Sequence, residues 1–178
     1  MNLYFWEMKR MEGIYLLLGT NLGDKKANLN MALHEITNRI GKIIAQSSVY
    51  ETDAWGKIDQ PAFLNMVVSV DTLLSPIQIL EQIGLIEQAI GRVRIEKWRE
   101  RIIDIDLLYY GDAEVNLPDL KVPHPEIARR RFTLVPLNEI ASEFVHPIFH
   151  KTQNQLLADC EDLLSVRKAG PLTDSTAK

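Results

Sequence analysis

Two strand-like segments follow one another without a helix between them, and this connection constrains the fold more than any other feature of the chain. Residues Ile43 to Glu51 alternate loosely between apolar and polar side chains, and Phe63 to Thr72 alternate well. The residues between them, Thr52 to Pro61, contain Gly56 and a proline, which indicates a loop. Parallel neighbours need a long crossover, usually a helix, so these strands are expected to pair antiparallel. The pattern favours an α+β sandwich over a doubly wound parallel sheet.

The other segments add helices and further strands to this pair. Three helices are expected from apolar residues at helical spacing: one ending at Gly41, one from Ser75 to Gly91, and one over Gln153 to Leu164. Ile14 to Leu18 and Ile102 to Tyr110 are short apolar runs, each followed by a glycine, and are typical of buried strands. We expect one domain over residues 13–165, with an N-terminal extension over residues 1–12 and a flexible C-terminal tail over residues 166–178.

Composition excludes several classes of protein. The 178 residues include one cysteine, Cys160, so neither an internal disulfide nor a cysteine metal cluster can form. No apolar run approaches the roughly 18 residues needed to span a bilayer. The net charge of −4 argues against general nucleic-acid binding. We therefore expect a cytoplasmic protein, either a monomer or a weak homodimer, that contacts neither membrane nor nucleic acid.

Basic residues are concentrated in two short segments of this acidic chain. Five of them lie between Arg92 and Arg101, and three more are consecutive from Arg129 to Arg131. Arginine binds phosphate oxygens through two parallel hydrogen bonds, and Trp98 offers an aromatic surface within the first segment. A charged loop can also be simply a solvated loop, but the concentration favours a site for a small, highly charged anion.

The segment Arg101 to Gly111 contains two aspartates at strand spacing. Side chains alternate across a strand, so Asp104 and Asp106 share one face, while Ile103, Ile105, Leu107 and Tyr109 project from the other into the core. The two α-carbons lie about 6.5–7 Å apart. Two anions so close repel each other unless a cation joins them, and Mg²⁺ typically takes one or two carboxylates plus substrate phosphates. The alternative is a solvated outer face, which the flanking arginines disfavour.

Other phosphate-binding motifs are absent from the sequence. It contains no GxxxxGK[ST] loop, no kinase GxGxxG or HRD motif, and no HExxH or other zinc spacing. The chain instead resembles the 6-hydroxymethyl-7,8-dihydropterin pyrophosphokinase family. The resemblance runs from about Ile14 to Leu164, and its motifs are LGTNLG at 18–23, QPAFLN at 60–65, Gly91-Arg92 with Arg94, the Arg101 to Gly111 segment, and VPHP at 122–125.

The resemblance implies a three-layer α/β/α sandwich around an antiparallel sheet with a ferredoxin-like core. It also implies transfer of pyrophosphate from ATP to the hydroxymethyl group of the pterin, with release of AMP, in folate biosynthesis. Two Mg²⁺ ions are implied at Asp104 and Asp106. The residues that match ATP contacts are Glu87, Arg92, Arg94, Trp98, Arg101, Leu107, His124 and Arg130. The residues that match pterin contacts are Thr52, Trp55, Phe63, Asn65 and Phe132.

Physical chemistry supports these roles. Phe63 and Phe132 can stack on both faces of a flat pterin, and Asn65 can pair with its edge through a carbonyl and an amide group. For the phenylalanines the alternative is ordinary core packing, and for His124 it is a place at a helix start ahead of Pro125. Arg92, Arg101 and Asp106 would act in catalysis by stabilising charge around the transferred group.

The chain departs from the family pattern around both loops. Asp53-Ala54 follow Thr52 where prolines are frequent, Trp55 stands where leucine is common, and Arg99-Glu100 replace a frequent Gly-Pro. Lys97 stands in place of a common arginine, so either Lys97 or Arg99 could reach ATP. Two rival functions stay open: a phosphohydrolase that uses the same carboxylates, and a ferredoxin-like module without enzymatic activity that binds RNA or a regulatory ligand.

Overall fold

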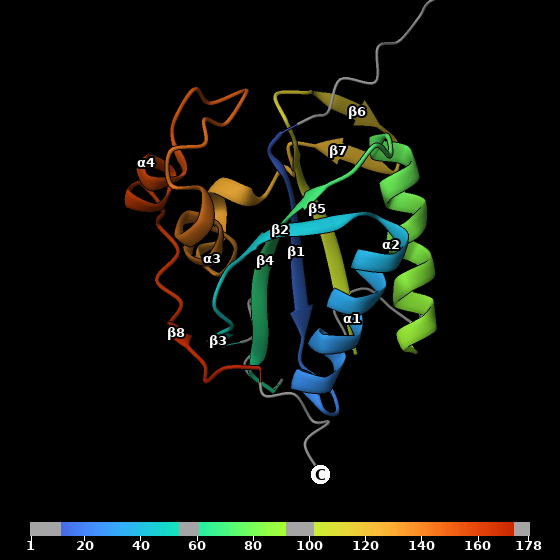
Figure 1. The fold of residues 1–178 in the computed structure, drawn as a ribbon. Coiled ribbons are helices and arrows are strands. Elements are labelled where there is room, and N and C mark those ends of the chain that lie inside the picture. The colour runs from blue at the N-terminus through green and yellow to red at the C-terminus, as the bar shows by residue number, and fades with distance from the viewer. Residues whose placement is uncertain (1–11, 54–60, 92–101, 173–178) are drawn as a thin grey trace, which may run out of the picture.

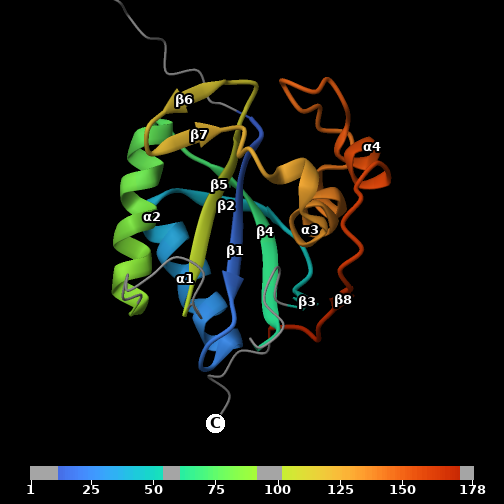
Figure 2. The same cartoon turned by 180° about the vertical axis from the view of Figure 1, so that it is seen from behind.

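Helices cover both faces of one antiparallel sheet in the computed structural model, which describes residues 12–53, 61–91 and 102–172. Figures 1 and 2 show this three-layer arrangement from opposite sides. On one face lie α1 (Lys25–Arg39) and α2 (Pro76–Ile90), and on the other lie α3 (Arg131–Ala141) and α4 (Gln153–Ala158). The three-layer α+β sandwich expected from the sequence is confirmed.

The sheet has the order β5-β1-β4-β3-β8, and β2 pairs with β4 beyond the end of β3. The strands are β1 (Ile14–Thr20), β2 (Lys42–Gln46), β3 (Tyr50–Thr52), β4 (Phe63–Asp71), β5 (Asp104–Tyr110) and β8 (Val166–Lys168). When β2 and β3 are counted as one interrupted strand, the elements from β1 to β5 follow the βαββαβ order of a ferredoxin-like core. Outside it, β6 (Val115–Leu117) and β7 (Leu120–Val122) form a hairpin, and η1 (Ile127–Arg129) precedes α3.

Two apolar cores lie on the two faces of the sheet. The core under α1 and α2 includes Leu16, Leu64 and Met66, whereas the core under α3 and α4 includes Leu17 and Val67. The alternation of side chains therefore sends neighbouring residues of β1 and β4 into different cores. Because both faces of the central strands are covered, their sequences are nearly continuous runs of apolar residues.

The caps of α2 follow from its sequence. Ser75 forms a capping box with Gln78, Pro76 occupies the first turn, and Gly91 ends the helix in the left-handed conformation with φ 103°. Ser75, Gln78 and the backbone at Gly91 satisfy groups that the helix itself leaves without partners, and Pro76 lacks an N–H that would have no partner in the first turn. The predicted start and end of this helix are confirmed.

Two of the expected strands differ from the structure. The single strand expected over Ile43 to Glu51 is divided into β2 and β3, since the Ser47 hydroxyl accepts a hydrogen bond from Val67 N–H and Ser48 N–H donates to Glu139. In β5 a bulge between the pairs Tyr15–Tyr109 and Leu16–Leu107 interrupts the alternation. Tyr109 therefore packs in the core under α3 and α4, and not beside Ile103 and Ile105 as expected.

The C-terminal part also differs from expectation. The helix expected over Gln153 to Leu164 ends at Ala158. Residues Val166–Lys168, expected to belong to a flexible tail, instead form β8 and pair with β3. This pairing joins residues more than one hundred positions apart, so no local pattern could indicate it. None of the described helices combines the length and hydropathy that crossing a membrane requires.

Candidate active site

One row of residues crosses the sheet at the end where β1 finishes and β4 and β5 begin. Gly19 of β1 pairs with Asp104 of β5 on one side and with Asn65 of β4 on the other, and Asn65 pairs with Tyr50 of β3. Two residues further toward the centre of the sheet, the next row on the same face contains Asp106, Leu17 and Val67. Directly paired residues point to the same face, so the register brings an aspartate and an asparagine to the same face with a glycine between them.

The two aspartates lie on the face of the sheet that α3 covers. Their neighbours Ile103 and Ile105 are buried in the opposite core under α1 and α2. Asp104 and Asp106 are both partly exposed, which leaves room for a ligand. Two carboxylates on a strand give a hard oxygen donor set of the kind that Mg²⁺ shares with substrate phosphates. Within the described residues, no three His, Cys, Asp or Glu side chains gather around a common point.

Gly19 leaves a gap between the aspartate and the asparagine. A Cβ atom at this position would lie 2.9 Å from Oδ1 of Asn65, closer than side chains normally approach. The glycine is therefore required by space and not by an unusual backbone conformation. Sequence reasoning noted Gly19 as part of a motif but not this role, because the role depends on the register of three strands.

Asn65 is held in place by a neighbouring hydroxyl group. Its Nδ2 donates to Oγ1 of Thr52 at 2.7 Å, and both residues are almost fully buried. With the amide nitrogen directed at Thr52, Oδ1 points over Gly19 and can accept a hydrogen bond from a ligand. Phe63 pairs with Thr52 across β3 and β4, so it lies on this same face.

A cationic and an aromatic group lie at the start of α3, the helix that covers this face. Phe132, in the first turn of α3, packs against the core under α3 and α4. The guanidinium carbon of Arg130 lies 5.7 Å from the centre of the Phe132 ring. The structure thus brings Thr52, Phe63 and Asn65 together, and it places Phe132, the fourth described residue that the resemblance assigns to the pterin, on the helix that covers the same face of the sheet.

His124 shares its surroundings with Arg130 and Asp104. Burial lowers the pKa of His124, the positive charge of Arg130 lowers it further, and the negative charges of Glu126 and Asp104 oppose the shift. The Nδ1 atom accepts a hydrogen bond from Glu126 N–H at 3.2 Å. His124 therefore lies within electrostatic range of both Arg130 and Asp104.

Two of the residues predicted to contact ATP do not lie on the face that carries the two aspartates. Leu107 is buried in the core under α1 and α2, on the face opposite Asp106. Glu87 of α2 is 4% exposed, and its carboxylate accepts a hydrogen bond from Ile105 N–H at 2.9 Å. Glu87 therefore ties α2 to the strand that carries the aspartates. A contact of either residue with ATP stays a prediction.

The remaining predicted site residues lie outside the described part of the chain, in residues 54–60 and 92–101. They are Trp55, Arg92, Arg94, Trp98 and Arg101. The same is true of Lys97 and Arg99, so the choice between these two as an ATP contact stays open.

Comparison with known proteins points to one family. The sequence model described as 7,8-dihydro-6-hydroxymethylpterin-pyrophosphokinase matches residues 15–142. The chain is 45% identical over 136 residues to the 2-amino-4-hydroxy-6-hydroxymethyldihydropteridine pyrophosphokinase of Methylorubrum extorquens, covering 76% of this chain and 86% of that protein. The Aquifex aeolicus protein of the same name is 40% identical over 141 residues, covering 79% and 88%.

A solved structure supports the fold independently. The crystal structure of wild-type Plasmodium falciparum HPPK-DHPS with SDX-DHP superimposes with a TM-score of 0.67 at 21% identity. The match covers 85% of this chain but 43% of that one, so the chain spans less than half of the Plasmodium protein. At this level of identity the likeness concerns the fold.

Proposed function

The chain belongs to the 7,8-dihydro-6-hydroxymethylpterin-pyrophosphokinase family, and from this premise we propose that it transfers pyrophosphate from ATP to the hydroxymethyl group of 6-hydroxymethyl-7,8-dihydropterin in folate biosynthesis. The observation that carries the proposal for the site is the row Asp104, Gly19 and Asn65. It places a carboxylate able to bind a metal and an amide able to bind a pterin on one face, with no side chain between them.

The pterin would lie between Asp104 and the aromatic residues of β4 and α3. Asn65 would accept a hydrogen bond through Oδ1 from a ring N–H, with Thr52 fixing the orientation of its amide. Phe63 and Phe132 would contact the flat ring, and burial against aromatic faces would exclude water from the reacting alcohol. This arrangement would direct the hydroxymethyl arm toward the aspartates.

ATP would lie on the side of β5, with its phosphates near Asp104 and Asp106. These two carboxylates would hold two Mg²⁺ ions, which supply positive charge to the phosphate oxygens and make the pterin hydroxyl a better nucleophile. Arg130 and His124 would contact the phosphates from the segment before α3. In such transfers the protein contributes mainly position and charge.

Arg92 and Arg101 complete the proposal as groups that neutralise charge on the departing AMP. As the resemblance implies, Arg94 and Trp98 would contact the nucleotide, and Trp55 would contact the pterin. The hydroxyl oxygen would attack the β-phosphorus, the bond from that phosphorus to the AMP oxygen would break, and the alcohol proton would leave to solvent.

Product analysis tests this proposal. The protein is incubated with ATP and Mg²⁺, with and without 6-hydroxymethyl-7,8-dihydropterin, and the nucleotides are separated by chromatography. We expect AMP only when the pterin is present, and no AMP after Mg²⁺ is removed with a chelator. ADP as the product, or equal release of AMP without the pterin, would favour an ordinary kinase or a phosphohydrolase.

A further inference from the structure

The pterin side of the site depends on a very short strand. β3 has three residues, and it carries Thr52, which holds the amide of Asn65. On one side β3 pairs with β4, and on the other it pairs with β8 from the C-terminal part of the chain. Tyr50 lies between the two, opposite Asn65 on one strand and Lys168 on the other. A three-residue strand makes few backbone hydrogen bonds, so its position depends on its neighbours.

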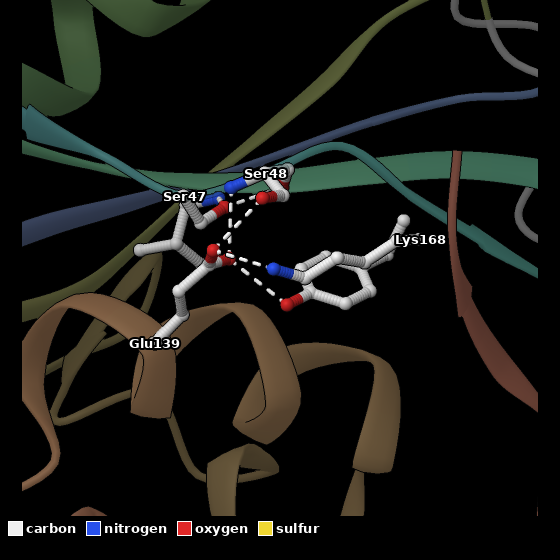
Figure 3. A network of polar contacts seen from close by, with 6 residues as sticks. Ser47, Ser48, Glu139 and Lys168 are labelled. Atoms are coloured by element: carbon white, nitrogen blue, oxygen red, sulfur yellow. Dashed lines mark hydrogen bonds and ion pairs between the residues drawn. The ribbon is translucent and has the colours of Figure 1, made fainter. Parts of the chain in front are cut away.

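One carboxylate connects β3, β8 and α3 (Figure 3). Glu139 of α3 accepts hydrogen bonds from Ser48 N–H and Ser48 Oγ, both at 2.8 Å. It also accepts from the Tyr50 hydroxyl at 2.9 Å and from Lys168 Nζ at 3.0 Å. Three of these four donors thus come from Ser48, two residues before β3, and from Tyr50 of β3 itself, and the fourth, the cation, comes from β8. Four donors on one carboxylate form a network, which stabilises more than an isolated surface ion pair.

The residues that follow β8 are attached at three further points. Ala169 N–H donates to the carbonyl of Val49 at 2.8 Å, which extends the contact between this segment and the approach to β3. Lys26 of α1 donates to the carbonyl of Pro171 at 2.9 Å. Ala169 and Leu172 also pack against the core under α1 and α2. Backbone pairing, charge and apolar contact therefore all hold this segment against the sheet.

We propose that the segment Val166–Leu172, here named the C-terminal clasp, is a positioning element for pterin binding. It would hold β3 against β4, so that Thr52 keeps the amide of Asn65 oriented over Gly19. The clasp lies beyond residue 142, where the match to the family model ends, so the role concerns a part of this chain outside that match. The inference rests on the proposed function, since it assumes that Asn65 binds a pterin.

The clasp acts on one substrate only. Asp104 and Asp106 lie on β5, which is separated from β3 by β1 and β4. Loss of a clasp contact should therefore leave the nucleotide side unchanged while Asn65 loses its fixed orientation. If the clasp has a merely structural role, loss of the same contact should instead lower the stability of the protein and weaken the binding of both ligands together.

Two substitutions and a matched control separate these outcomes. Lys168→Met removes the cation from Glu139, and Glu139→Ala removes the shared acceptor. Lys151→Met is the control, because Lys151 forms an exposed ion pair of 2.8 Å with Asp159, on the α4 side of the molecule. Lys168→Arg keeps the charge and serves as the conservative rescue. Calorimetry measures the dissociation constant of a non-hydrolysable ATP analogue with Mg²⁺, and then that of the pterin in its presence.

We expect Glu139→Ala to weaken pterin binding roughly tenfold and Lys168→Met a few-fold, with analogue binding changed by less than about twofold. Lys168→Arg should restore pterin binding, and Lys151→Met should match the wild type. Unchanged pterin binding in both clasp variants, or an equal loss for both ligands, would overturn the inference. If the wild-type protein binds the analogue but no pterin, the proposed function itself is wrong, and the inference with it.

Discussion

Asp104 and Asp106 share a face because β5 alternates regularly between Ile103 and Leu107. This much follows from the sequence, since a period of two residues needs no knowledge of the partner strands. The shared face of Phe63 and Asn65 on β4 follows in the same way. Gly19 is different, because its importance arises from its pairing with both Asp104 and Asn65. No local sequence pattern predicts the pairing of strands that are distant along the chain.

Replacement of either aspartate by asparagine tests the metal assignment. Asp104→Asn and Asp106→Asn keep the shape of the side chain but remove the charge that would hold Mg²⁺ and ATP. We expect turnover to fall roughly 100-fold or more, with the fold intact by circular dichroism. Asp112→Asn, at an exposed aspartate just after β5, is the control and should keep normal turnover. Near-normal activity of either site variant would refute the assignment.

Gly19→Ala tests the gap between the two halves of the site. A methyl group 2.9 Å from Oδ1 of Asn65 must displace that amide and strain its bond to Thr52. Pterin binding should weaken by about 1–3 kcal/mol in titration calorimetry. Gly84→Ala is the control: Gly84 lies within α2 with no atom within 4 Å of a new Cβ, so it should raise stability by about 0.5–1 kcal/mol and leave binding unchanged. Normal pterin affinity in Gly19→Ala would contradict the described geometry.

At the scale of elements, predictability depends on whether the signals are local. α2 was predicted at both ends because Ser75, Pro76 and Gly91 each carry a local conformational preference. The break between β2 and β3 has no such local signal. It depends on hydrogen bonds of Ser47 and Ser48 with Val67 and Glu139, which lie far along the chain. β8 was missed for the same reason, since three residues with two positive charges do not resemble a strand until their partner is known.

Glu87→Ala tests the tie between α2 and β5. The substitution leaves Ile105 N–H, which lies between the two aspartates in sequence, without its carboxylate acceptor in a buried position. We expect the free energy of unfolding in urea to fall by roughly 1–3 kcal/mol. Glu87→Gln keeps a carbonyl acceptor of the same size and should lose distinctly less. Equal losses in both variants would show that the charge of Glu87, and not the hydrogen bond to Ile105, provides the stability.

At the scale of the whole molecule, His146 and Glu139 are two of the described groups that couple folding to pH. Burial lowers the pKa of His146 to about 4 from an ordinary 6.5. Between these two pH values His146 is therefore protonated in the unfolded chain and neutral in the folded protein. Burial alone would raise the pKa of Glu139, but hydrogen bonds from Ser48, Lys168 and Tyr50 outweigh it and lower the pKa to about 2 from 4.5. Both shifts mean that the unfolded state takes up protons first as the pH falls.

Stability should therefore decrease in two successive steps on acidification. The contribution of buried His146 is lost between about pH 6.5 and 4, by up to roughly 3 kcal/mol. That of Glu139 is lost between about pH 4.5 and 2 and is smaller, because Glu139 is exposed and solvent screens its interactions. Urea unfolding across this range measures the loss. Glu139→Gln should remove most of the lower step and leave the upper one. A wild-type stability that stays constant from pH 7 to pH 3 would contradict both assignments.

The central claim is that the face between β5 and β4 joins a nucleotide and a pterin for pyrophosphoryl transfer, and the destination of the β-phosphate tests it most directly. ATP labelled at the β-phosphate and ATP labelled at the α-phosphate are each incubated with the protein, Mg²⁺ and 6-hydroxymethyl-7,8-dihydropterin, and the products are separated. The account predicts that the β-label appears in the pterin product and that the α-label stays in AMP. A β-label found in ADP or in free pyrophosphate, with an unlabelled pterin, would contradict it.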